Sequence, residues 1–110
     1  FHSSLMTPFA PRFEDILVSS PFKAAKTKFI SNVDCAFHDQ PDELIRLLVQ
    51  QLYSPVRFES CVERLIEEGA DTFIEFGPSS PLSGLVKRIK KDAKIISITT
   101  LEQLEAEGIR

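Results

Sequence analysis

The sequence predicts an α/β fold in which three short, mostly parallel strands are flanked by about four or five helices. Two apolar runs of strand length, residues 72–76 and 94–99, are separated by a segment with helical periodicity. A strand, a helix and a second strand in this order form a parallel crossover. The composition supports this class, because 43% hydrophobic and 26% charged residues are typical of a soluble globular domain.

The first helix is predicted before residue 19. Its apolar residues recur at helical spacing around a possible N-cap at Thr7, and they are Met6, Phe9, Phe13, Ile16 and Leu17. Pro11 delays the regular turns until about residue 11, because proline has no amide hydrogen. Residues 27–34 then form a strand candidate that ends at Asn32 and Asp34, since both residue types favour turns.

Two amphipathic helices follow. An apolar stripe predicts a helix over residues 41–53, and the stripe consists of Leu44, Leu48 and Leu52, flanked by Ile45 and Val49. Pro41 suits the first position of this helix. The apolar residues of the next helix follow the i, i+3, i+4, i+7 rule and are Phe58, Cys61, Val62, Leu65 and Ile66. Gly69 predicts a left-handed end to this helix.

The helix between the last two strands is predicted to begin at Pro81. Its inward-facing residues are Leu82, Leu85, Val86 and Ile89. The turn before it, "GPSSPLSG", lies at the carboxyl edge of the predicted sheet, where open α/β proteins bind ligands. Residues 101–110 form either a short polar helix or a fraying tail.

Charge and composition exclude several classes of function. A net charge of −3 and a pI near 5.4 argue against nucleic-acid binding, which needs many basic residues. The sequence has no run of about 18 apolar residues and no signal-peptide pattern, so we expect a cytoplasmic protein without a membrane partner. Cys35 and Cys61 lack metal-ligand spacing, so we expect reduced, partly buried thiols rather than a disulfide or a metal site.

Four stretches stand out as motifs: "FHSSLM", "SNVD", "QLYSPVRF" and "EFGPSSPLSGLVKRI". In this order they resemble the malonyl-CoA:acyl carrier protein transacylases, the acyltransferase family of fatty acid and polyketide synthesis. The resemblance implies that residues 1–110 are the C-terminal portion of an α/β-hydrolase-like acyltransferase domain, starting at its catalytic histidine motif. Since the chain begins on Phe1 without a Met, we expect an ordered, cleaved or separately built portion of a longer enzyme whose N-terminal part is missing.

The family's reaction suggests roles for two residues. In this family a serine attacks the thioester of malonyl-CoA, and the malonyl group passes through an acyl-enzyme to the phosphopantetheine thiol of acyl carrier protein. His2 matches the histidine that takes the serine proton, a role that suits an imidazole. Gln51 matches the residue whose backbone carbonyl orients that histidine, and it lies in the last turn of its helix, where carbonyls lack helical partners. Malonyl-CoA and acyl carrier protein are the expected partners, and no cofactor or metal is expected.

Phe1 and Asn32 are the candidate substrate-binding residues. In related domains an aromatic residue before the histidine accompanies a preference for malonyl over methylmalonyl groups. Asn32 matches a motif that lines the active-site floor, and a simple turn residue is its alternative reading. We expect His38 to be a surface residue of a polar loop. The basic run at residues 87–91 is either a carrier-protein surface or a solvated helix end that complements the helix dipole.

The chain departs from the family pattern in two ways. It has "GPSSP" where the family usually has Gly-Pro-Gly, which puts the detail of that turn in doubt. The serine elbow, the malonate-binding arginine and the oxyanion-hole residues are expected to have no counterpart, because in the family's order the chain starts after them. The serines of "PSSP" and "HSS" lack the GxSxG spacing of a nucleophile. Residues 1–110 alone are therefore expected to be inactive. The alternative function is a non-catalytic interaction or structural fragment of the same fold.

Overall fold

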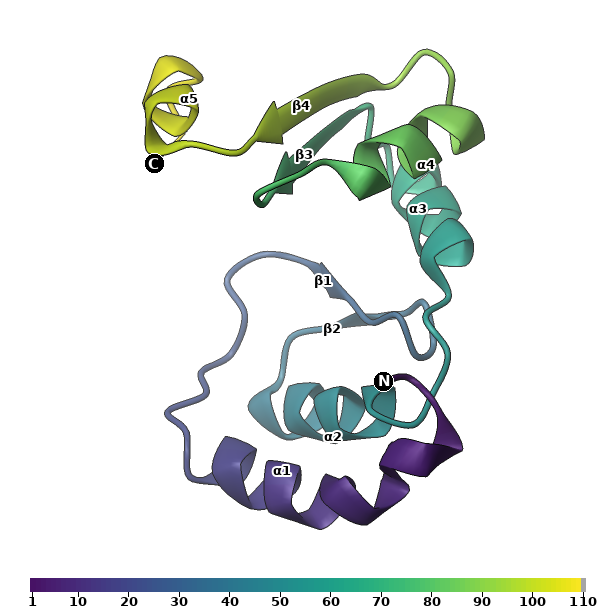
Figure 1. The fold of residues 1–110 in the computed structure, drawn as a ribbon, viewed down its shortest axis with the longest axis vertical. Coiled ribbons are helices and arrows are strands. Elements are labelled where there is room, and N and C mark those ends of the chain that lie inside the picture. Colours follow the sequence, from purple (N-terminus) through teal and green to yellow (C-terminus); the bar gives the residue numbers. More distant parts are fainter. Residues whose placement is uncertain (110) are drawn as a thin grey trace. The chain divides into compact units, whose positions relative to one another are not determined.

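The computed structural model describes residues 1–109 and separates into two compact units, with the boundary between Cys61 and Val62 (Figure 1). The elements in chain order are η1 (Ser4–Phe9), α1 (Ala10–Val18), β1 (Phe29–Ile30), β2 (Phe37–His38), α2 (Pro41–Gln51), α3 (Phe58–Glu67), β3 (Thr72–Phe76), α4 (Pro81–Ile89), β4 (Lys94–Ile98) and α5 (Leu101–Ala106). The mixed α/β class predicted from the sequence is confirmed.

The N-terminal helical segment begins earlier than predicted. η1 is a 3-10 helix that continues directly into α1, and its N-cap is Ser3. Thr7 lies inside η1, so the predicted cap at Thr7 is wrong. Pro8 and Pro11 have no amide hydrogen to donate, and short 3-10 turns and first helical turns tolerate this loss. The two prolines therefore explain why the chain forms a 3-10 segment before the regular α-helical turns.

The core of the first unit lies between α1 and α2. Its buried residues are Ala10, Leu17 and Val49, and the half-buried side chains packed against them are Phe13, Phe22, Ile45, Leu48 and Leu52. The predicted helix is confirmed over Pro41–Gln51, although its most buried residue is Leu47, which the predicted stripe did not include. α2 carries apolar residues on more than one face, so only packing decides which face is covered.

A short antiparallel ribbon replaces the strand predicted at residues 27–34. β1 contains only two residues and pairs with β2, with Phe29 opposite His38 and Ile30 opposite Phe37. The described residues thus contain four strands in two separate two-stranded sheets. The predicted number of three strands is therefore wrong, and the β1–β2 pair is antiparallel instead of parallel. Two residues per strand are too few to produce a detectable period in the sequence.

The second unit contains the predicted parallel crossover. β3 and β4 pair in parallel, from Thr72 beside Lys94 to Phe76 beside Ile98, and α4 connects them and contacts both. Val86 of α4 and Ile98 of β4 are among the buried residues of this unit. Both strands, the connecting helix and its start at Pro81 agree with the sequence prediction.

The N-terminus of α4 is held by a carboxylate from the neighbouring strand. Glu75 of β3 accepts hydrogen bonds from the Leu82 amide at 3.0 Å and the Ser83 amide at 2.7 Å. The Ser83 hydroxyl also donates to Glu75 at 2.6 Å, and it lies 3.1 Å from the Ser97 hydroxyl of β4. The carboxylate satisfies amides that have no partner within the helix and lies at the positive end of the helix dipole. One side chain thus connects the strand to the crossover helix.

Gly69 terminates α3 two residues after its last helical residue, Glu67, as the sequence predicts. Gly69 has φ +98°, its amide donates to Ile66 O, and the next amide, of Ala70, donates to Leu65 O. These two hydrogen bonds form a Schellman motif, which requires a left-handed residue at the position of Gly69.

Residues 101–106 are helical rather than frayed. Thr100 is the N-cap of α5, its side chain accepts from the Gln103 amide, and the Gln103 side chain accepts in return from the Thr100 amide. This capping box provides partners for two amides at the start of a short helix.

We predict that Glu75→Gln lowers the thermal midpoint at neutral pH, because a neutral amide is a weaker acceptor and interacts less with the helix dipole. The Ser83 hydroxyl and the amides of Leu82 and Ser83 hold the pKa of Glu75 below its ordinary value of 4.5. The carboxylate therefore stabilises the fold above pH 4.5, and this contribution is lost as the pH falls through the lowered folded-state pKa.

Thermal unfolding of the wild type and of Glu75→Gln from pH 7 to pH 3 checks this prediction. The difference between their midpoints should shrink below pH 4.5. Glu63→Gln, which changes an exposed glutamate of α3, is the matched control and should have little effect. A difference between wild type and Glu75→Gln that is constant with pH would contradict the capping role.

Candidate functional site

The structure brings His2 against the end of α2. His2 Nδ1 lies 2.9 Å from the backbone carbonyl oxygen of Gln51, a contact between residues 49 positions apart. A carbonyl oxygen can only accept a hydrogen bond, so Nδ1 carries the proton and donates. In the neutral ring Nε2 is then the unprotonated nitrogen with a free lone pair.

The backbone around this contact is locally constrained. His2 has φ +60°, in the left-handed region that residues with a Cβ seldom adopt. Its side chain is exposed. An exposed imidazole with one nitrogen anchored and the other unprotonated can exchange protons with a reacting group.

The carbonyl of Gln51 is available because α2 ends there. The amides of Leu52 and Tyr53 donate to carbonyls of Val49 and Gln50, which leaves the Gln51 oxygen outside the helical pattern. This carbonyl also lies at the negative end of the helix dipole. The position of the helix end therefore creates the acceptor that His2 uses.

The side chain of Gln51 makes contacts of its own. Its Nε2 donates to Ser54 O at 3.0 Å, approaches Pro55 O at 3.4 Å and lies 3.5 Å from His2 Nδ1. These contacts hold the chain that leaves α2 and so restrain the residue whose carbonyl faces His2. The sequence reasoning missed this role, although Ser54 and Pro55 follow Gln51 closely in the "QLYSP" motif.

Asn32 and Gln51 line the same small cavity. Its volume is about 90 Å³, and the other lining residues are Phe29, Ser31, Leu47 and Leu48. The carbonyl of Asn32 accepts a hydrogen bond from the Arg57 amide at 3.1 Å. Ser31 is buried, and its hydroxyl accepts from the Val33 amide at 3.1 Å. The SNVD turn is thus held by its main chain beside the end of α2.

Phe1 is not packed against these residues. Its side chain is 91% exposed, so the described structure gives it no enclosed pocket. Of the four predicted site residues, the fold joins His2 to Gln51 by a hydrogen bond and Asn32 to Gln51 through the cavity, and it leaves Phe1 at the surface.

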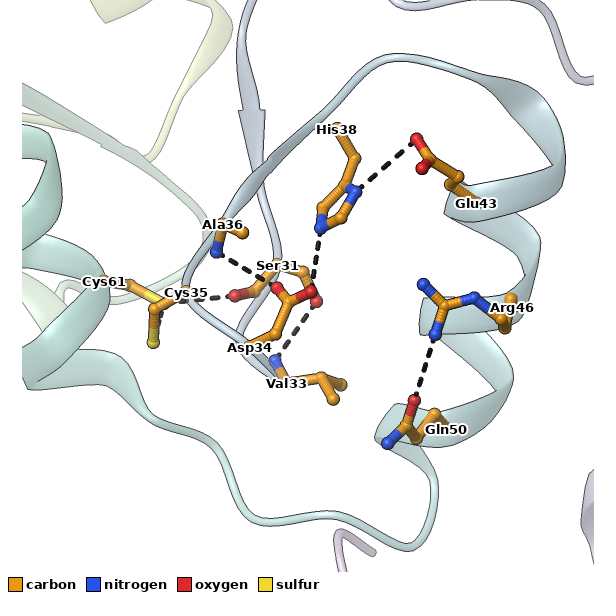
Figure 2. A network of polar contacts seen from close by, with 10 residues as sticks. All are labelled: Ser31, Val33, Asp34, Cys35, Ala36, His38, Glu43, Arg46, Gln50 and Cys61. Carbon is orange, nitrogen blue, oxygen red and sulfur yellow. Dashed lines mark hydrogen bonds and ion pairs between the residues drawn. The ribbon is translucent and has the colours of Figure 1, made fainter.

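His38 is not the surface loop residue that the sequence suggested. It lies in β2, and its side chain is 12% exposed. Figure 2 shows it between the carboxylates of Asp34 and Glu43. Nε2 lies 2.9 Å from Asp34 Oδ2, and Nδ1 lies 3.5 Å from Glu43 Oε2. Burial raises the pKa of Asp34, but hydrogen bonds from the Ala36 amide and from His38 outweigh it, and the pKa lies below its usual value. These contacts tie the β1–β2 turn to α2.

The basic run of α4 makes contacts within its own unit. Lys87 Nζ donates to Ala93 O at 2.9 Å, and Lys90 pairs with Asp92 at 3.3 Å. Both contacts hold the turn between α4 and β4.

No group of three or more His, Cys, Asp or Glu residues within residues 1–109 could hold a metal ion. Among the helices described, none has both the length and the apolar character needed to cross a membrane.

Comparisons with known proteins place this site in context. The malonyl CoA-acyl carrier protein transacylase of Bacillus subtilis (strain 168) is 42% identical over 105 residues, which are 96% of this chain and 33% of the relative. The transacylase of Staphylococcus aureus (strain COL) is 40% identical over 105 residues, with 96% and 34% covered. No protein-family model matches the chain. The chain thus spans about a third of the length of the curated relatives it matches.

Solved structures match the fold. The acyl-carrier-protein S-malonyltransferase of Bartonella henselae superimposes with a TM-score of 0.89 at 34% identity, covering 97% of this chain and 34% of the other. A malonyl-transacylase solved in complex with its type II PKS acyl carrier protein gives a TM-score of 0.86 at 30% identity, covering 96% and 34%. From sequence and structure together, this chain is a homologue of the malonyl-CoA:acyl carrier protein transacylases and corresponds to one portion of them.

Proposed function

We propose that the chain is the C-terminal portion of an α/β-hydrolase-like acyltransferase domain. The complete enzyme transfers a malonyl group from malonyl-CoA to the phosphopantetheine thiol of an acyl carrier protein. The observation that carries the proposal is the hydrogen bond from His2 Nδ1 to the Gln51 carbonyl, which prepares the other ring nitrogen to act as a base. The homology to transacylases over 96% of the chain supports the same reaction.

In this proposal His2 is the general base and general acid. Its Nε2 takes the proton of a serine hydroxyl supplied by the rest of the enzyme, as that oxygen attacks the malonyl thioester. The imidazolium then returns a proton to the departing CoA thiolate. When the carrier thiol attacks the acyl-enzyme, the same nitrogen takes the thiol proton and returns it to the serine oxygen.

Gln51 orients the base through its main chain. A carbonyl at the end of α2 holds Nδ1–H, so the ring keeps Nε2 toward the reacting groups. The negative end of the helix dipole also stabilises the imidazolium that forms during each proton transfer. In this arrangement the neutral carbonyl of Gln51 orients the histidine ring, a role that a carboxylate fills in many serine hydrolases.

Asn32 and Phe1 are proposed to bind the substrate. Asn32 and Gln51 line the same cavity, so the turn that contains Asn32 forms one wall of this cavity. The wall lies beside Gln51, whose carbonyl holds the proposed base. Phe1 directly precedes His2 and is exposed, which leaves its ring free to limit the space beside the acyl group.

The partners in this proposal are malonyl-CoA, an acyl carrier protein and the remaining part of the enzyme. A related transacylase has been solved with its acyl carrier protein, which supports the choice of carrier. The N-terminal helices present exposed apolar side chains at Leu5, Phe9 and Ile16, which are 83%, 58% and 57% exposed. We propose that these side chains pack against the remaining part of the enzyme, since removing apolar surface from water is favourable.

We predict that His2→Ala in the complete enzyme lowers kcat for malonyl transfer by at least about 10²-fold, the low end for loss of a general base. Transfer of radiolabelled malonyl groups to a carrier protein bearing its phosphopantetheine arm measures this. His38→Gln is the matched control, because it changes the other histidine and should lower the thermal midpoint without a comparable loss of kcat. Wild-type turnover in His2→Ala at saturating malonyl-CoA would remove His2 from the mechanism.

We predict that Gln51→Ala lowers kcat by roughly fivefold to tenfold with little change in KM. The carbonyl remains, but the side-chain hydrogen bonds to Ser54 and Pro55 that position it are lost, together with the 3.5 Å contact to His2 Nδ1, at about 1 kcal/mol for a net hydrogen bond. Gln50→Ala is the control, since that side chain contacts Arg46 on the same helix. Equal effects of the two substitutions on kcat would contradict a positioning role for Gln51.

We predict that Phe1→Ser relaxes the preference for malonyl over methylmalonyl groups by some tens of fold without reversing it. One methyl group contributes only about 1–3 kcal/mol of discrimination in such a pocket. The measurement is the ratio of kcat/KM for malonyl-CoA and methylmalonyl-CoA in the wild type and the variant. An unchanged ratio would remove Phe1 from substrate selection.

A further inference from the structure

Two cysteines that are distant in the sequence have adjacent sulfur atoms. Cys35 and Cys61 are 26 positions apart, and their Sγ atoms lie 3.2 Å from each other (Figure 2). A disulfide bond is about 2.05 Å long, so the sulfurs need to approach by only a little more than ~1 Å to bond. Both cysteines are free thiols in this structure.

The backbone holds both cysteines in place. Cys35 lies in the β1–β2 turn, where its amide donates to Ser31 O at 2.9 Å. Cys61 lies in α3, where its amide donates to Arg57 O. The Arg57 amide in turn donates to Asn32 O, which belongs to the β1–β2 turn that also contains Cys35. The two thiols therefore face each other across two segments joined by main-chain hydrogen bonds.

The two thiols differ in exposure. Cys35 is half-buried, and its Sγ lies 3.6 Å from Arg57 O. Cys61 is only 4% exposed, and its thiol donates to Ser31 O at 3.3 Å. Burial, together with the nearby Cys35, raises the pKa of Cys61 to about 12. An oxidant therefore meets Cys35 first, and Cys61 reacts second.

A metal site does not explain this pair. Structural zinc requires four ligands, and residues 1–109 contain no group of three His, Cys, Asp or Glu residues arranged to hold a metal. Two adjacent thiols that lack further metal ligands can still react with each other, and the reaction available to them is formation of a disulfide bond.

We propose that Cys35 and Cys61 form a reversible modification site that closes to an intramolecular disulfide by exchange with an oxidised small-molecule disulfide such as oxidised glutathione. The Cys35 thiolate attacks one glutathione sulfur, which forms a mixed disulfide and releases one glutathione thiolate. The Cys61 thiolate then attacks the Cys35 sulfur and releases the second. The two cysteine protons pass to the two glutathione thiolates, so one oxidised glutathione becomes two reduced molecules as two thiols become one disulfide.

The second step is favoured over a lasting glutathione adduct. The Cys61 sulfur is already beside its target, so the exchange is intramolecular and has a high effective concentration. Conversion of Cys35 to a mixed disulfide also removes the neighbouring thiol, which after burial is the main cause of the raised pKa of Cys61. The closed bond joins the turn that contains Asn32 to α3.

The test treats the purified whole protein that carries this chain with oxidised glutathione, blocks free thiols with iodoacetamide, and maps tryptic peptides without reduction. Cleavage after lysine and arginine places Cys35 in residues 29–46 and Cys61 in residues 58–64, so the linked pair has its own mass whatever other cysteines the protein contains. We expect the linked peptide to exceed the peptide with glutathione on Cys35 by at least about tenfold, and to disappear after reduction.

Cys61→Ser and Cys35→Ser are the matched controls. Cys61→Ser should accumulate the glutathione adduct on Cys35, because the second step is absent, and Cys35→Ser should leave Cys61 almost unmodified. In the wild type, the thermal midpoint should rise on oxidation, and neither variant should show this rise. Separately alkylated peptides, or a lasting glutathione adduct on wild-type Cys35, would overturn the proposal.

Discussion

The candidate site depends on where α2 ends. Because Gln51 is the last residue of this helix, its carbonyl has no helical partner and can accept the Nδ1 proton of His2. One more helical turn would direct the carbonyl to an amide of its own helix and leave the imidazole without its acceptor. The side chain of Gln51 secures this end by donating to Ser54 O. A local feature of one helix thus determines the orientation of a residue 49 positions away.

The SNVD turn joins the remaining parts of the first unit. The carbonyl of Ser31 accepts from both the Cys35 amide and the Cys61 thiol, and the carbonyl of Asn32 accepts from the Arg57 amide. Asp34 extends the same turn to His38, which also contacts Glu43 at the start of α2. The turn therefore connects to α2 and to the first residues of α3. The cavity beside Asn32 and Gln51 and the paired thiols are two consequences of this one arrangement.

The second unit is organised by a different constraint, the parallel crossover. A helix that connects two parallel strands begins with unpaired amides close to the carboxyl end of the first strand. Here Glu75 of β3 accepts from two of those amides, and the Ser83 hydroxyl links it to Ser97 of β4. The basic residues Lys87 and Lys90 hold the far end of the crossover.

Local sequence signals determined the helices and the crossover. The periodicity of α2 and α3, the glycine at position 69 and the strands β3 and β4 were all predictable, because each depends on residues close together in the chain. The family motifs also indicated His2 and the Gln51 carbonyl as candidates. The predicted Thr7 cap was wrong because two prolines favour a 3-10 segment at the start of the helix. Thr7 therefore lies inside this segment, although the spacing of the apolar residues suggested a helix that begins after it.

Only the tertiary structure decided which distant residues meet. The β1–β2 ribbon has two residues in each strand and no readable period, so its antiparallel pairing and the burial of His38 between Asp34 and Glu43 could not be predicted. The approach of Cys35 to Cys61 was hidden for the same reason, because neither cysteine has a spacing that marks the other. Contacts between segments far apart in sequence depend on how their elements pack, and no window of neighbouring residues contains that information.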